Sequence, residues 1–158
     1  MPEKALLEEM SGSVVFYAPV PASILASAQT VPELANRVAF GSNSFGLKDM
    51  PIGVDVYIYA SQPPHDLYNP GMVTWTGKLG AIVRAVEGTR RSGKHPDKSI
   101  RPPYAESDDT PATYFWEVLG LGLLTEPIPL ARFKNMGGGK AFGGRAPEWP
   151  MLALLQSP

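Results

Sequence analysis

The chain lacks several features that would define a function class. None of its 158 residues is cysteine, which excludes disulfides, thiolate zinc sites, iron–sulfur clusters and cysteine nucleophiles. No apolar run approaches the roughly 20 residues needed to span a bilayer. The first ten residues contain two leucines flanked by acids, unlike a secretory signal. We therefore expect a cytoplasmic protein without a membrane partner.

Catalytic signatures are scarce as well. The two histidines, His65 and His95, each lie near an aspartate in a proline-rich segment, without the spacing of metal ligands. The serine elbow Gly-x-Ser-x-Gly is missing. The glycine-rich stretch 137–145 lacks the Gly-Lys-Ser/Thr ending of a phosphate-binding loop, because Ala141 follows Lys140. We expect no enzyme activity, no metal and no cofactor.

The remaining sequence is typical of a β-rich domain. Segments rich in β-branched and aromatic residues predict strands at 14–20, 54–61, 72–87, 114–119 and 151–155. Gly77 and Gly80 interrupt the third segment, as expected where a strand bends around a small barrel. These segments predict an α+β, β-rich fold with about five to six mostly antiparallel strands and one or two short helices.

One of those helices is predicted after Thr30. The order Thr30-Val31-Pro32-Glu33 has the form of a capping box. Val31, Leu34, Ala35 and Val38 then recur at helical spacing, and Gly41 supplies a stop.

The whole chain, residues 1–158, is expected to form a single domain. Two long connections remain, at 88–113 and 133–150. Connections of this length in a compact domain are usually functional or disordered, so they are the first places to search for a site.

Basic residues are distributed unevenly. Eleven of the fourteen lysines and arginines follow residue 77, although the net charge is only −1. If the two long connections lie on one side of the molecule, their basic residues form a rim suited to phosphates. The alternative, an ordinary soluble surface, is equally open. The candidate phosphate contacts are Arg84, Arg90, Arg91, Lys94, Arg132, Lys134, Lys140 and Arg145.

The order of elements resembles the PUA-like superfamily of small pseudo-barrels, and within it the EVE and ASCH domains. The resemblance is carried by the Gly53–Ser61 segment, by Trp116-Glu117-Val118, and by a Glu-Pro-Ile-Pro-Leu turn starting at Glu126. It spans residues 13 to 155. Such domains use an aromatic pocket in a basic surface to bind RNA or DNA, often with a modified or flipped base.

The resemblance implies a base pocket near the matching segments. Tyr59, Ser61 and Trp116 match pocket-bearing positions, and Trp75 and Asn43 are added from position alone. The predicted function is a non-catalytic module that binds RNA or DNA. Two alternatives remain open: a sensor for a small, nucleotide-like ligand, and a protein-interaction subunit of an oligomer such as a homodimer.

Overall fold

The chain folds around one mixed sheet, as seen in a computed structural model that describes residues 13–42, 47, 50–61, 71–85, 97–103, 112–136, 141–142 and 146–156. Seven strands lie in the order β2-β5-β4-β3-β1-β7-β6. Their bounds are β1 Ser13–Pro21, β2 Arg37–Ser42, β3 Asp55–Ser61, β4 Met72–Arg84, β5 Tyr114–Pro129, β6 Phe133–Asn135 and β7 Met151–Leu155. The helical elements given by the described residues are α2 Ala22–Gln29 and the short 3-10 helices η1 Pro32–Ala35, η3 Lys98–Ile100 and η4 Leu130–Arg132.

The expectation of a β-rich, mostly antiparallel α+β fold is confirmed. Neighbouring strands pair antiparallel except β1 and β3, which are parallel. The five strand segments expected from the sequence all appear, and β2 and β6 add two more. No pairing within the described ranges joins the outer strands β2 and β6, so the sheet there is open. No helix in those ranges is long and apolar enough to cross a membrane.

The helix expected after Thr30 forms only in part, as the short 3-10 helix η1, and it does not continue through Val38. The α-helix α2 lies before this segment: it begins directly after Pro21, ends at Gln29 and has Thr30 as its C-terminal cap. The chain then forms η1 and continues as β2, with Val38 opposite Val118 and Phe40 opposite Trp116 on β5. Pairing and burial of these side chains outweigh the helical spacing. Gly41 permits a close approach, since a Cβ there would lie 2.7 Å from Ala112 Cβ.

The expected Glu-Pro-Ile-Pro-Leu turn is also wrong. Residues 126–129 belong to β5, where Ile128 lies opposite Val73 of β4, and Leu130 begins η4. The paired part of β2 ends at Leu119 of β5, so the second half of β5 has no neighbour on that side among the described strands. Prolines are tolerated there because their missing N–H removes no ladder hydrogen bond.

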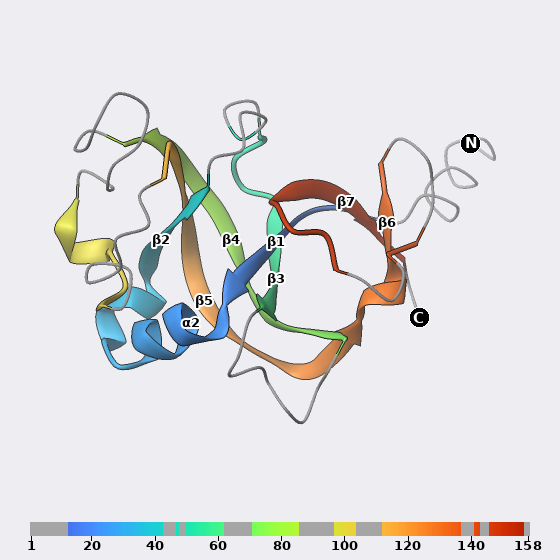
Figure 1. Cartoon of the computed structure of the whole chain (residues 1–158), viewed down its shortest axis with the longest axis horizontal. Helices are drawn as coiled ribbons and strands as arrows, with labels where there is room; N and C mark the ends of the chain where they lie inside the picture. The colour runs from blue at the N-terminus through green and yellow to red at the C-terminus, as the bar shows by residue number, and fades with distance from the viewer. Residues whose placement is uncertain are drawn as a thin grey trace.

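Strands β1 and β3 lie at the centre of the sheet and are covered on both faces. Phe16 and Ile58 point into a large core, whereas Tyr17 and Tyr57 point to the other face. The large core consists of the buried side chains of α2, η1, β2 and the start of β5 with one face of β1, β3 and β4. Figure 1 shows β2 and α2 at one end of the molecule and β6 and β7 at the other.

The opposite face holds a smaller group, which we call the aromatic cluster. Its buried members are Val15, Tyr17, Val73, Leu130, Phe133, Phe142 and Ala153. Both faces of the sheet therefore bury apolar side chains, and the continuous apolar sequence of β1 reflects this two-sided burial.

Candidate functional site

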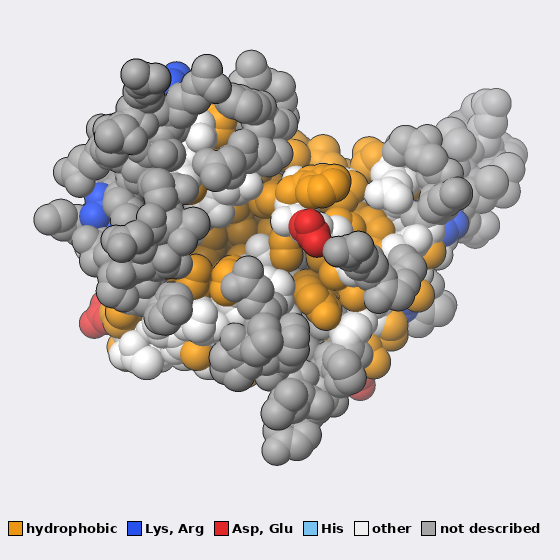
Figure 2. Space-filling model, in the orientation of Figure 1, with side chains coloured by type: hydrophobic (Ala, Val, Ile, Leu, Met, Phe, Trp, Pro, Cys, Tyr) orange, Lys and Arg blue, Asp and Glu red, His pale blue; other side chains and the backbone are white. Residues whose placement is uncertain are grey.

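A pocket of about 440 Å³ opens beside the aromatic cluster, between β6 and the segment that leads into β7. Its volume lies within the range typical of small-ligand sites. Figure 2 shows apolar side chains gathered around a hollow near the centre of this face, with an acidic side chain among them. The pocket is lined by Asn135, Ala141, Phe142, Ala146, Pro147, Glu148, Trp149 and Met151.

Strand register explains why Asn135 and Met151 reach this space. Asn135 lies opposite Ala153 of β7, and Met151 lies opposite Tyr17 of β1. Successive strand side chains alternate between faces, so Met151 and Ala153 lie on one face with Tyr17. Asn135 is on that face too, and Lys134 is directed to the other.

Rings form the floor of the pocket and one of its walls. Phe142 is 3% exposed and lies in the aromatic cluster, while Trp149 is 58% exposed. The neighbouring Pro150 is buried, so the chain is anchored immediately after the tryptophan. An exposed ring held by a buried neighbour offers a flat surface to a ligand.

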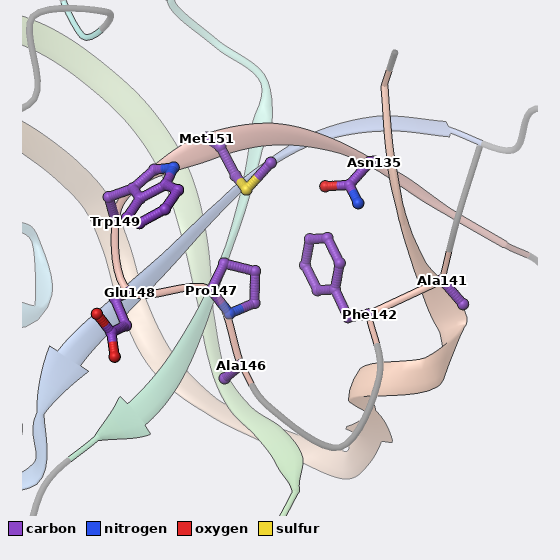
Figure 3. Close-up of a pocket in the computed structure, with 8 residues that line it drawn as sticks. All are labelled: Asn135, Ala141, Phe142, Ala146, Pro147, Glu148, Trp149 and Met151. Atoms are coloured by element: carbon purple, nitrogen blue, oxygen red, sulfur yellow. The ribbon is translucent and has the colours of Figure 1, made fainter. Parts of the chain in front are cut away.

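Polar groups in the lining are few. In Figure 3 the Asn135 amide points from β6 toward Phe142 and Met151, and Trp149 stands on the other side of Pro147. The Glu148 carboxylate points away from the Asn135 amide. Among the described lining residues, the arrangement therefore offers one amide, with both donor and acceptor, beside mostly apolar side chains.

Behind the pocket, Tyr17 connects the lining to the central strand. Its hydroxyl donates a hydrogen bond to the Pro147 carbonyl oxygen at 3.1 Å. Its ring meets Phe142 edge-on, with centroids 5.0 Å apart, and packs against Phe133 at 6.2 Å. Burial raises the pKa of Tyr17, and the nearby Tyr59 acts in the same direction. Tyr17 therefore remains a neutral donor at physiological pH.

Of the five residues expected in a base pocket, the four that the structure describes are not among those lining this one. Trp75 and Trp116 are buried in the large core, and Trp116 lies 5.1 Å from the ring of Phe16 and 5.0 Å from that of Phe40. Tyr59 packs against the aromatic cluster, and Ser61 ends β3 beside Pro21. Asn43 lies outside the described residues.

Three of the expected phosphate contacts are among the described residues, and they lie at two places in the fold. Arg84 ends β4 opposite Tyr114 of β5. Arg132 and Lys134 lie on η4 and β6, next to the pocket, but the Arg132 guanidinium donates two hydrogen bonds to the Gln156 carbonyl oxygen, at 2.6 and 3.0 Å. The remaining candidates, all outside the described residues, are Arg90, Arg91, Lys94, Lys140 and Arg145.

An ion pair lies away from the pocket, between Arg37 of β2 and Glu117 of β5. Glu117 is 3% exposed, and one of its carboxylate oxygens accepts a hydrogen bond from Arg37 at 2.8 Å. Asp97 lies 3.7 Å from the same guanidinium. The Glu117 hydrogen bond is the main cause that raises the pKa of Arg37. These side chains join the 97–103 segment to the sheet, a structural role. No cluster of three acidic or histidine side chains suited to a metal occurs in the described ranges.

The sequence did indicate the region of the pocket but missed its residues. The 133–150 connection was one of the two places expected to be functional, and seven of the eight lining residues fall within it. Trp149 was missed because it lies between prolines and glycines and not on a strand. A tryptophan in such a segment, close to a second aromatic residue, is the signal that could have found it. Comparisons of the chain with protein-family models, curated proteins and solved structures found no match.

Proposed function

We propose that this chain is a non-catalytic binding module for RNA or DNA, and that the 135–151 pocket receives a single base. The observation that carries the proposal is Trp149, a largely exposed indole at an apolar pocket that contains an amide. Stacking a base on an aromatic side chain contributes roughly 1–3 kcal/mol. The Asn135 amide offers the donor and acceptor that the edge of a base requires.

Lys134, one of the expected phosphate contacts, is half-buried and lies next to Asn135 in the chain, but it is directed to the face of β6 opposite the pocket. The expected PUA-like pseudo-barrel belongs to this proposal as well. Its support is the strongly curved, mostly antiparallel sheet with side chains packed on both faces (Figure 1).

Fluorescence anisotropy with labelled single- and double-stranded RNA and DNA, at low and moderate salt, tests the proposal. We expect single strands to bind, and binding to weaken as salt rises because phosphate contacts release counterions. Trp149→Ala should weaken binding about five- to a hundredfold. Ile52→Ala is the matched control, since Ile52 is 69% exposed and does not line the pocket. Unchanged anisotropy with every oligonucleotide at low salt would rule the proposal out.

One observation favours a second candidate, a small neutral or cationic ligand. The charged residue in the lining is Glu148, and neither lysine nor arginine is among the described lining residues. A carboxylate among the lining residues disfavours a polyanion and favours an amine or a neutral ring. Free nucleosides and aromatic amines, titrated against the tryptophan fluorescence of the unmodified protein and of Trp149→Phe, distinguish the candidates: saturation by these molecules without oligonucleotide binding selects the second.

A further inference from the structure

The pocket wall that carries Trp149 has few backbone pairings of its own among the described residues. Residues 146–150 form no helix or strand, and the lining there is a short run of Ala146, Pro147, Glu148 and Trp149. Such a segment orders its side chains only if something anchors it. The anchors that lie closest in the chain are β7, which begins at Met151, and the buried Pro150.

A further anchor comes from far away in the sequence. Tyr17 is fully buried, and its hydroxyl donates to the Pro147 carbonyl oxygen across 130 positions of sequence. Its ring also fixes Phe142, the pocket floor, through an edge-on contact at 5.0 Å. A single side chain of the central strand thus contacts both floor and wall.

We infer that Tyr17 is the positioning residue of the pocket: its hydroxyl holds Pro147, and through it Trp149, in the orientation that receives the ligand. Tyr17 itself does not line the pocket, so its effect on a ligand is transmitted through these two residues. A preformed wall avoids the entropy cost of ordering a loop upon binding. The inference deepens the proposed function and rests on it for the ligand, although the wall geometry can be tested without any ligand.

Tyr17→Phe is the direct test, because it removes the hydroxyl and keeps the ring against Phe142. Tyr57→Phe is the matched control. Tyr57 pairs with Tyr17 in the register of β1 and β3, and its ring contacts Phe133 at 5.7 Å. It belongs to the same face of the sheet but does not line the pocket.

The ligand-free readout is the fluorine NMR spectrum of protein labelled with fluorotryptophan. The three tryptophans give separate signals, and Trp149→Phe identifies the one that belongs to Trp149. We expect Tyr17→Phe to shift or broaden the Trp149 signal, and Tyr57→Phe to leave it in place. An unchanged Trp149 signal in Tyr17→Phe would overturn the inference and leave the proposed function standing.

The second readout is the affinity for a labelled single-stranded oligonucleotide, measured in a double-mutant cycle. Tyr17→Phe should weaken binding about three- to tenfold, the net effect of one hydrogen bond. In a Trp149→Ala background the same change should have little effect, since the residue through which it acts is gone. Equal losses in both backgrounds would mean that Tyr17 only supports the fold. If no oligonucleotide binds the unmodified protein, the proposed function fails while the NMR result still decides the role of Tyr17.

Discussion

The large core and the aromatic cluster occupy opposite faces of the same central strands, yet they are built differently. The large core has Trp116 at its centre, is covered by α2 and η1, and is closed by paired strands. The aromatic cluster relies on ring contacts among Tyr17, Phe133 and Phe142. Its outer strand β6 has three residues, and its edge opens into the pocket. The first region supplies stability, and the second exposes a surface that a ligand can reach.

The largest expected effect comes from breaking the large core. Trp116→Ala should lower the free energy of unfolding by about 3–5 kcal/mol, because the indole is 1% exposed and packed between Phe16 and Phe40. Urea denaturation followed by circular dichroism measures the change. A loss below about 1 kcal/mol would contradict the statement that the large core supplies the stability of the fold.

The corresponding change in the aromatic cluster should be milder for stability and stronger for function. Phe142→Ala removes a ring that is 3% exposed, but this ring already borders an open pocket and so has packing partners on fewer sides. We expect a loss of about 1–3 kcal/mol in the same assay, together with loss of ligand binding in the pocket. If Phe142→Ala destabilises the fold as much as Trp116→Ala does, the aromatic cluster is a second structural core.

The difference between the regions also explains what the sequence could predict. Strands that bury one or both faces carry their own signal, and β1, β3, β4 and β7 appear within a few residues of their expected positions. Strand β2 was missed because Val31, Leu34, Ala35 and Val38 have helical spacing. Only the partner strand β5, far along the chain, makes Val38 and Phe40 part of a sheet.

The site was less predictable, for a related reason. Trp75 and Trp116 look like ligand-binding aromatics in the sequence, but alternation and pairing place both in the large core. Trp149 and Asn135 acquire a role only when β6 pairs with β7 and when Tyr17 holds Pro147. Contacts across 130 residues leave no local pattern in a single sequence.

The smallest expected effect is the change that Tyr17, in the aromatic cluster, makes to the stability of the fold at alkaline pH. Burial raises the pKa of Tyr17 above its ordinary value of 10.0, so above pH 10 the unfolded chain loses the phenolic proton while the folded chain keeps it. The folded state then binds more protons, and stability decreases with rising pH. The contribution of this tyrosine is therefore complete below pH 10 and is lost progressively above it.

Thermal unfolding of the unmodified protein, Tyr17→Phe and Tyr57→Phe between neutral pH and pH 11 measures this effect. Tyr17→Phe should be less stable at neutral pH, because the Pro147 carbonyl loses its donor, but its stability should decline less between pH 9 and 11. The stability of Tyr57→Phe should also decline less than that of the unmodified protein between pH 9 and 11, but by a smaller margin. The pKa of Tyr57 is raised by burial and by Asp55 but is lowered by Lys78 and Arg132. A Tyr17→Phe curve parallel to that of the unmodified protein would show that the Tyr17 phenol ionises without unfolding the chain. The aromatic cluster would then be open to water behind the pocket as well as in front of it.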